Sequence, residues 1–503
     1  MWPVIDLARP GGVALALLPE LVLTGWSLFL TLVVAWRHRT ERDQALVGQL
    51  SVLGLVLTMA VVGLFWVQGV RVEGLESMMA LDGFRYATSL IFLLGAVLAV
   101  LLSLGYLGRE RIVVPEYYLL VLYATVGMMF MGGGADLVIV FLGLELMSVC
   151  VYVLAGIDRR SVFAAEAALK YFLLGAFASA FLLYGIALIY GATGTTNLGL
   201  IYVQVETLRL ENNPMLLIGI GLLLVGFAFK VAAVPFHMWT PDVYDGAPTP
   251  ITAFMAAAVK AAAFAAMIRV LLEGLMPADA VWTEIVWWLS AVTMLVGNLI
   301  ALAQRNIKRM LAYSSIGHAG YLLAAVASGT GLGASAFLFY VLAYTLMTIG
   351  AFAVVGALGR RGERDVRVED LNGLAQQRPW LALAMMVFML SLLGFPGTAG
   401  FIGKWYILSA VVESQQTLLA IVLVGATVVS AGYYLPVIMA MFMKPPASET
   451  AHDHVSLLGV ARWVVAATAV VLLLLGVWPG RAMDVARQGT EDLRPSILLT
   501  VSR

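Results

Sequence analysis

Four of the six lysines in this chain lie inside long apolar runs, whereas nearly all of the 24 arginines lie in loops or close to the ends of such runs. The four are Lys170 in AALKYFLL, Lys230 in GFAFKVAA, Lys260 in AAAVKAAAF and Lys404 in GFIGKWYIL. An arginine stays protonated in almost any environment, but a desolvated lysine can lose its proton near physiological pH. Buried lysines and peripheral arginines together predict a protein that transfers protons through its interior.

Each of these lysines also has a structural interpretation. A charge at the centre of a bilayer costs at least about 2.5–3.5 kcal/mol, so each lysine must face the protein interior, find a partner, or be neutral part of the time. Glu166 lies one turn before Lys170, and an i,i+4 ion pair would explain that lysine structurally. Lys230 and Lys260 have no such neighbour, and Lys404 follows a helix break. Proton transfer is the stronger interpretation for all four lysines, and it has the most support for Lys230 and Lys260.

One carboxylate, Glu145 in LVIVFLGLELMSVCVYVL, lies near the middle of an apolar run. Alone in lipid this group would be protonated, but beside a lysine it could ionise. It is either a neutralising partner for a buried lysine or one half of a proton gate that opens and closes, and the sequence leaves both interpretations open.

Two apolar runs carry helix breakers. The run FAFKVAAVPFHMWTPDVYDGAPTP places Pro235 five residues after Lys230, and SLLGFPGTAGFIGKW places Pro396 among four glycines before Lys404. At membrane depth such breaks are tolerated only where they are buried in protein or line a watered cavity. Two interrupted helices, each near a lysine, are typical of inverted-repeat transporters.

Two histidines are candidates for extending the line of lysines. His237 follows the first break and can either shuttle protons near neutral pH or bond the freed backbone carbonyls. His318, in AYSSIGHAGYLL, is the second candidate. His452 and His454 lie in one polar stretch, where we expect a solvated loop rather than a metal site.

The composition indicates an all-helical, polytopic membrane protein. Hydrophobic residues make up 62% of the chain and charged residues 12%, against roughly 45–50% and 25% in soluble domains. The net charge is zero, so no global field attracts nucleic acid. The single cysteine, Cys150, excludes a disulfide framework and a thiolate metal site. The N-terminus lacks the features of a cleaved signal peptide.

At roughly 20 apolar residues per helix, the chain holds about fourteen spans. We expect them to begin near Val13, Ala45, Phe84, Tyr117, Leu137, Val162, Met215, Ile251, Val281, Met310, Ala334, Trp380, Leu418 and Arg462. Basic residues concentrate in the loops after odd-numbered spans, which predicts that both termini lie on the outer (periplasmic) side of the membrane.

Spans four to eight and nine to thirteen form two five-helix units, with the break in the fourth helix of each. An offset of five spans gives these units opposite topology, so we expect inverted repeats. We therefore expect the chain to divide into an N-terminal three-helix segment (1–114), a first repeat (115–278), a second repeat (279–445), and a C-terminal helix and tail (446–503). Residues 193–213 alternate in polarity and predict an external hairpin, and residues 360–378 predict a solvated loop.

Four segments of the sequence resemble the antiporter-like subunits of respiratory complex I. They are FLGLELMS, AFKVAAVPFHMWTPDVYDGAPTPITAF, NIKRMLAYSSIGHAGYLL and GFPGTAGFIGKWYIL, and the resemblance covers roughly residues 115–445. Lys404, where the M-type has a glutamate, argues against that type. The absence of a long C-terminal lateral helix argues against the L-type. Pro19–Glu20 and the DGF at 82–84 are similar to the N-type.

The resemblance implies a role for each matching residue. Glu145 and Lys230 would be the paired carboxylate and lysine of the input half, and Lys170 would modulate that pair. His237 would bridge towards Lys260, the central lysine. Lys404 would be the terminal lysine of the output half.

The resemblance also implies where the redox chemistry lies. The chain carries no flavin, cluster or nicotinamide motif, so NADH, FMN, iron–sulfur clusters and quinone are expected in other subunits. Expected partners are an antiporter-like neighbour, small membrane subunits and the lipid bilayer of a bacterial inner membrane, without nucleic acid. The alternatives are a subunit of a cation/proton antiporter or membrane-bound hydrogenase complex, a structural subunit that conducts nothing, and, with less support, a free-standing transporter.

Overall fold

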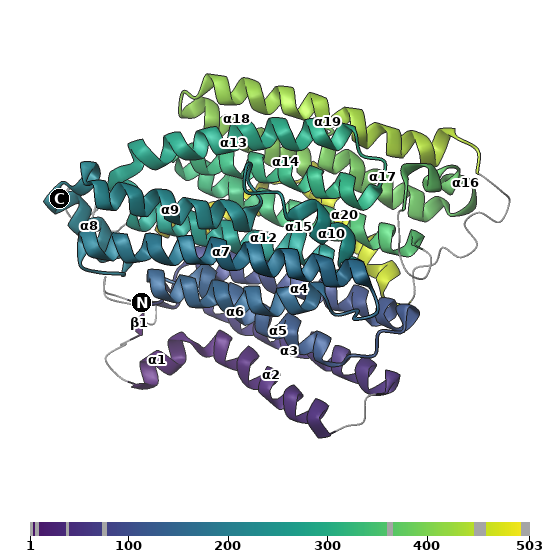
Figure 1. The fold of residues 1–503 in the computed structure, drawn as a ribbon, viewed down its shortest axis with the longest axis horizontal. Helices are drawn as coiled ribbons and strands as arrows, with labels where there is room; N and C mark the ends of the chain where they lie inside the picture. The colour runs from purple at the N-terminus through teal and green to yellow at the C-terminus, as the bar shows by residue number, and fades with distance from the viewer. Residues whose placement is uncertain are drawn as a thin grey trace.

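Apolar segments form long helices that run side by side along the longest axis of the molecule (Figure 1). Helices predominate because a backbone in lipid must satisfy its hydrogen bonds within its own segment. The computed structural model describes residues 4–5, 10–36, 40–72, 78–359, 366–446 and 459–493. The expected all-helical, polytopic fold is confirmed.

The first part of the chain contains a two-residue parallel strand pair and the helices before residue 134. These elements are β1 (Val4–Ile5), α1 (Pro10–Ala16), α2 (Leu18–Trp36), α3 (Glu41–Val67), β2 (Arg71–Val72), α4 (Gly83–Glu110) and α5 (Glu116–Gly133).

The central part holds Glu145 and three of the four lysines in question. Its elements are α6 (Leu137–Ala155), α7 (Val162–Thr193), α8 (Leu198–Leu208), η1 (Leu210–Asn212), α9 (Pro214–Val231), α10 (Thr240–Gly246), α11 (Thr249–Phe254), η2 (Met255–Val259), α12 (Lys260–Arg269), η3 (Val270–Gly274) and η4 (Met276–Ala278).

The remaining part holds Lys404 and the candidate His318. Its elements are α13 (Asp279–Leu302), α14 (Ile307–Ala327), α15 (Gly331–Leu358), η5 (Val368–Leu371), α16 (Leu374–Gln377), α17 (Pro379–Leu393), α18 (Ala399–Glu413), α19 (Thr417–Met443), α20 (Ala461–Val477), α21 (Gly480–Gln488) and η6 (Glu491–Leu493).

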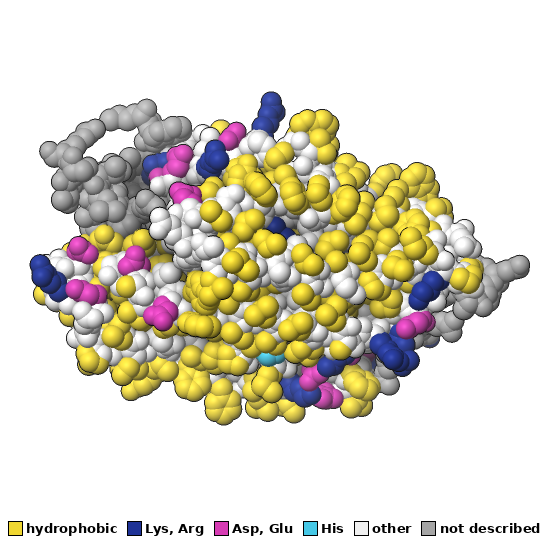
Figure 2. All heavy atoms as spheres, turned by 90° about the horizontal axis from the view of Figure 1, so that it is seen from above, with side chains coloured by type: hydrophobic (Ala, Val, Ile, Leu, Met, Phe, Trp, Pro, Cys, Tyr) yellow, Lys and Arg dark blue, Asp and Glu magenta, His cyan; other side chains and the backbone are white. Residues whose placement is uncertain are grey.

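Eleven helical segments of the described chain are long and apolar enough to cross a membrane, or up to twelve if the bent pair at Ala461–Val477 and Gly480–Leu493 is one span. Helices α5, α17 and α18, of 18, 15 and 15 residues, are not among them. Figure 2 shows hydrophobic side chains over the middle of one face, with charged side chains mostly towards its two ends. This is the distribution expected of a surface that contacts lipid.

Both expected helix breaks are present. Helix α9 ends at Val231, Ala232 has a left-handed φ of +63°, and regular helix resumes only at α10. Helix α17 ends at Leu393, and Gly394 and Gly397 have φ values of +88° and +87°, which glycine adopts without strain. The Val234 N–H freed by the first break donates to Thr293 Oγ1 at 2.9 Å, so this backbone donor finds its hydrogen-bond partner within the protein.

The prediction of a hairpin within residues 193–213 is wrong, because this stretch contains helix α8. The Asn197 side chain caps the helix by accepting from the Leu200 N–H. Leu198, Ile201 and Val205 then share one buried helical face, so helical spacing of the large apolar residues outweighs the two-residue alternation.

The expected loop at 360–378 forms two short helices, η5 and α16, over its described part, and Leu371 and Leu374 there are buried. Residues 360–365 lie outside the described residues. His452 and His454 also lie outside them, so the solvated loop expected there stays a prediction.

Candidate functional site

Lys230 lies in the last turn of α9, directly before the first break. Its side chain is buried, and its Nζ donates to Ser148 Oγ at 2.7 Å and to Tyr152 OH at 2.9 Å. Ser148 and Tyr152 are four residues apart on α6 and so lie on one face of that helix. The Tyr152 ring adds a cation–π contact, with its centroid 5.1 Å from Nζ. The ammonium is thus held by hydroxyls and a ring face.

Glu145 lies one turn before Ser148 on α6 and is half-buried. Its carboxylate accepts a hydrogen bond from Ser179 Oγ of α7 at 2.5 Å. Among the described residues, no ion pair joins Glu145 to Lys230, whose direct partners are the two hydroxyls. The role of Glu145 as the carboxylate paired with Lys230 therefore stays a prediction.

Lys170 has a different environment, because it is bound to two carboxylates. Its Nζ lies 2.6 Å from Glu166 and 2.8 Å from Asp242, and its side chain is 41% exposed. The expected i,i+4 ion pair is present. Asp242, in α10, also binds the Arg309 guanidinium at 2.9 Å, so one carboxylate links α7 to α14. The sequence analysis did not single out Asp242, although it lies in the HMWTPDVYDGAPTP motif.

Lys260 is buried in the centre of the molecule, at the first residue of α12. The preceding segment η2 is a π-helical turn, a distortion frequently found at functional sites. The Lys260 Nζ donates to Ser315 Oγ at 2.5 Å and to the Ser315 carbonyl at 2.8 Å. Ser315 lies on α14, so this contact joins the two halves of the chain.

Ser314, the neighbour of Ser315 on α14, belongs to a second group of polar side chains, around His318. The Ser314 hydroxyl bonds the hydroxyl of Tyr434, which lies 3.0 Å from His318 Nε2. His318 is buried, and its Nδ1 lies 2.6 Å from the hydroxyl of Tyr340. Both imidazole nitrogens therefore have hydroxyl partners that can donate or accept.

Lys404 lies in α18, just after the second break, and is buried. Its Nζ donates to the carbonyls of Leu392 and Leu393, each at 3.0 Å. These carbonyls are free because α17 ends there, and a helix C-terminus carries a partial negative charge. The Tyr321 ring centroid lies 4.4 Å from Nζ, and Tyr321 is one turn beyond His318 on α14. The ring centroids of His318 and Tyr321 lie 5.6 Å apart, so His318, Tyr321 and Lys404 form one cluster.

His237 is half-buried in the irregular segment between α9 and α10. Within the described chain, no hydrogen bond joins it to Lys230 or Lys260. Its bridging role therefore stays a prediction.

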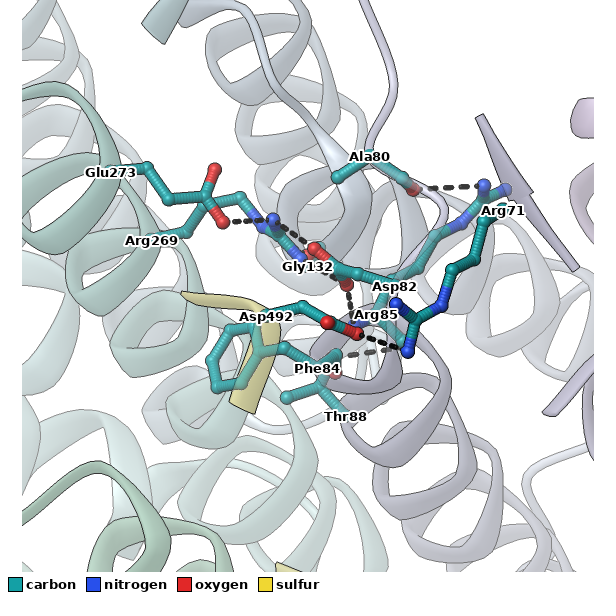
Figure 3. A network of polar contacts seen from close by, with 10 residues as sticks. All are labelled: Arg71, Ala80, Asp82, Phe84, Arg85, Thr88, Gly132, Arg269, Glu273 and Asp492. Carbon is teal, nitrogen blue, oxygen red and sulfur yellow. Dashed lines mark hydrogen bonds and ion pairs between the residues drawn. The ribbon is translucent and has the colours of Figure 1, made fainter. Parts of the chain in front are cut away.

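A second buried polar cluster, which the sequence analysis missed, surrounds Arg269 (Figure 3). Arg269 is fully buried and makes a bidentate ion pair with Asp82 at 2.7 and 2.9 Å and another with Glu273 at 2.5 Å. Burial alone would raise the pKa of the Asp82 carboxyl, but Arg269 and Arg85 hold that pKa below its usual value. Arg85 also pairs with buried Glu20 at 2.7 Å. This cluster ties α2, α4 and α12 together and holds no lysine.

The sequence located the lysines and histidines but not the hydroxyls that bind them. Ser148, Tyr152, Ser315, Tyr434 and Tyr340 are common residue types in apolar helices, so only their spatial convergence marks them. Lys308, which is buried like Lys230, Lys260 and Lys404, was also missed because it lies next to a loop. In the part of the chain that the structure describes, no group of three or more metal-ligating side chains is present.

The fold and the site define a class of protein: a polytopic helical membrane protein that buries Lys230, Lys260, Lys404 and His318 among hydroxyls and carbonyls. The family model described as "NADH:quinone oxidoreductase/Mrp antiporter, TM" matches residues 134–430, more than half of the chain. The chain belongs to this family.

Individual relatives narrow the assignment. The chain is 47% identical to "NADH-quinone oxidoreductase subunit N" of Gemmatimonas aurantiaca, over 98% of this chain and 96% of that protein. A chain of respiratory complex I from Thermus thermophilus is 39% identical with a TM-score of 0.78, covering 93% of this chain and 99% of that one. A chain of the Mrp complex from Dietzia has a TM-score of 0.81 at 22% identity, covering 95% and 98%, and shares the fold. Within the family, the chain is an antiporter-like subunit of the subunit N group.

Proposed function

We propose that this chain is a proton-translocating membrane subunit of NADH:quinone oxidoreductase. It moves protons through buried Glu, Lys and His side chains, and quinone reduction in other subunits drives it. The similarity to proteins named subunit N extends over nearly the full length, which supports the assignment to this enzyme complex. The chemistry of the groups that contact the lysines supports the role in proton transport.

The observation that carries the proposal is the kind of partner each lysine has. Among the described residues, Lys230, Lys260 and Lys404 contact hydroxyls, carbonyls and ring faces but make no ion pair with a carboxylate. A serine or tyrosine hydroxyl accepts a hydrogen bond from an ammonium and donates one to a neutral amine, so it serves both states of a lysine. A carboxylate would hold the lysine charged, as Glu166 and Asp242 do for Lys170.

The proposed order of transfer follows these contacts. The input half contains Glu145 and Lys230, with Lys170 modulating the pair from the Asp242 cluster. His237 would bridge from Lys230 towards the central Lys260, as the similarity to the family implies.

The proposed output half continues along α14. Ser315 binds Lys260, its neighbour Ser314 bonds Tyr434, Tyr434 contacts His318, and the Tyr321 ring lies under Lys404. Two nearby positive charges raise each other's free energy, so protonating one lysine favours deprotonating the next. Successive changes of charge would pass a proton along the line.

The proposed topology has fourteen spans. The eleven long apolar segments, together with α5, the broken pair α17–α18 and α20, would supply them. The two breaks, after α9 and after α17, support inverted repeats at 115–278 and 279–445, between the segments 1–114 and 446–503. An even number of spans places both termini on one side, which the loop charges assign to the periplasmic side of a bacterial inner membrane.

The proposed partners are the neighbouring antiporter-like subunit and small membrane subunits of the same complex. FMN, the iron–sulfur clusters and the NADH and quinone sites would belong to other subunits. Redox energy would therefore reach this chain as a conformational or electrostatic change.

A second candidate function is a structural subunit that conducts nothing. One observation favours it: Lys230 joins α9 to α6, and Lys260 joins α12 to α14, so each lysine also holds two helices together. A third candidate, a subunit of a cation/proton antiporter complex, rests on the shared fold.

The test is proton pumping by the whole complex, reconstituted in vesicles, with Lys260→Ala compared with Lys444→Ala. Lys444 is exposed at the end of α19, so its substitution removes the same charge outside the proposed path. We expect Lys260→Ala to assemble and to lose most proton pumping. Normal assembly with normal protons per electron would exclude the transport role, and loss of assembly alone would support the structural one. Sodium-dependent pumping would favour the antiporter.

A further inference from the structure

The surface of α17 and α20 contains a groove that the proton path does not use. It encloses about 760 Å³ and is lined by Leu383 and Val387 of α17 and by Val465, Ala469 and Leu473 of α20. Arg378 and Arg462 also line it. We propose that this groove binds one anionic phospholipid, with an acyl chain along the groove and the phosphate at the two arginines.

The length of the groove fits a single leaflet. Its lining on α20 runs from Arg462 to Leu473, eleven residues, which at about 1.5 Å per residue is about 16 Å. The hydrocarbon core of a bilayer is about 30 Å thick, so the groove extends through about half of it. A lipid in one leaflet has this length, with its headgroup at the surface and its chain end near the midplane.

The charges of the groove identify the end that holds the headgroup. Arg378 lies directly before the first residue of α17, and Arg462 is the second residue of α20. These helices begin the twelfth and the fourteenth of the proposed spans, which run in the same direction, so both arginines belong to the same end of the groove. The described lining contains no acidic residue. Guanidinium groups bind phosphate oxygens in a fork, and basic sites between membrane helices bind anionic headgroups.

Two tryptophans place this end at the membrane surface. Trp380 is 82% exposed and Trp463 is 62% exposed, and each lies within two residues of one of the arginines. Exposed tryptophans concentrate at the level of the lipid headgroups. Beyond them the described lining is apolar, with Ala384, Ala466 and Ala469 leaving room for a chain. The combination of a surface cation pair and a one-leaflet apolar groove favours a lipid over the helix of another subunit, which would continue through both leaflets.

The groove lies on the helix that positions Lys404. The carbonyls of Leu392 and Leu393, at the end of α17, accept hydrogen bonds from Lys404. A lipid packed along α17 would restrain this helix. Lipid occupancy is therefore expected to affect proton pumping as well, although the binding itself does not depend on the proposed function.

The test uses the intact complex and a phosphatidylglycerol that carries a photoactivatable diazirine in one acyl chain. After irradiation, peptide mapping should find the probe on α17 and α20. Unlabelled phosphatidylglycerol should compete for this site, and phosphatidylcholine should not. Arg462→Gln should reduce labelling at this site about fivefold, from the roughly 1 kcal/mol that one surface arginine contributes to binding anionic lipid. The matched control is Arg209→Gln, which removes an exposed arginine far from the groove and should leave labelling unchanged.

A second variant, Ala466→Trp, fills the groove without removing charge and should also abolish labelling there. Equal labelling by a phosphatidylcholine probe, or unchanged labelling in both groove variants, would overturn the proposal, because the groove would then hold only bulk lipid. Absence of probe from α17 and α20, or a cross-link between this groove and another subunit, would also overturn it and would assign the groove to a protein partner.

Discussion

Ser315→Ala offers the sharpest perturbation of the proposed path, because it leaves Lys260 in place and removes one of its two partners. Lys260 Nζ donates to Ser315 Oγ at 2.5 Å and to the Ser315 carbonyl at 2.8 Å, and the substitution deletes only the first contact. A hydrogen bond to a charged group is worth about 1.5–3 kcal/mol in a buried site. The protonated state of Lys260 becomes less stable by this amount. If that state lies on the path, its formation should slow about ten- to hundred-and-fifty-fold.

The assay is the initial rate of proton uptake by vesicles that contain the whole complex, measured together with NADH oxidation. The control is Ser290→Ala, which removes a buried hydroxyl of equal size that donates to the Gly320 carbonyl at 2.8 Å and touches no lysine. We expect Ser315→Ala to slow pumping at least tenfold and Ser290→Ala to leave it near normal. Equal pumping by both variants, with the complex fully assembled, would refute the assignment of Lys260 to the path.

Three further predictions concern other parts of the molecule. Arg269→Met should lower the free energy of unfolding by about 3–5 kcal/mol, read as a lower thermal midpoint, because it leaves the Asp82 carboxylate buried and unpaired. Since Arg269 and Arg85 hold the pKa of Asp82 below its usual value in the native protein, the stability that this carboxylate contributes is present at neutral pH and is lost as the pH falls through that lowered pKa, so the difference between Arg269→Met and the parent protein should shrink in acid. Gly400→Ala places a methyl group against a backbone carbonyl at the end of α17, so it should lower the free energy of unfolding by about 1–3 kcal/mol and impair pumping. Gly425→Ala places its methyl group within 4 Å of no other atom, so it should change neither. Asp242→Asn removes two partly exposed ion pairs, so it should cost only about 1–2 kcal/mol in stability while changing the pH profile of pumping.

Several features of the fold could be predicted from the sequence because they depend on local composition. Helices α6 and α7 begin at Leu137 and Val162, as expected from where the apolar runs begin. The two breaks follow from Pro235 and Pro396 and the glycines around the second, which cannot continue a regular helix. The hairpin expected at 193–213 fails because a two-residue alternation over a few residues also fits a capped helix with one buried face.

The four lysines could be identified from sequence because a charge in lipid is costly wherever the chain folds, so its presence in an apolar run is itself informative. Their partners could not, because each comes from a distant part of the chain. Ser315 lies 55 residues from Lys260, and Ser148 lies 82 residues from Lys230. Nothing in the local sequence distinguishes these serines from others on apolar helices.

What the sequence by itself determined is the membrane class, the helix breaks and the residues that can carry a proton, because hydrophobicity and backbone chemistry act locally. What only the tertiary structure decided is the state that each lysine can adopt. Lys170 meets two carboxylates and is held charged, whereas Lys260 meets a hydroxyl and a carbonyl. The difference arises from how helices pack, since the free energy of a buried charge depends on the few groups within hydrogen-bonding distance.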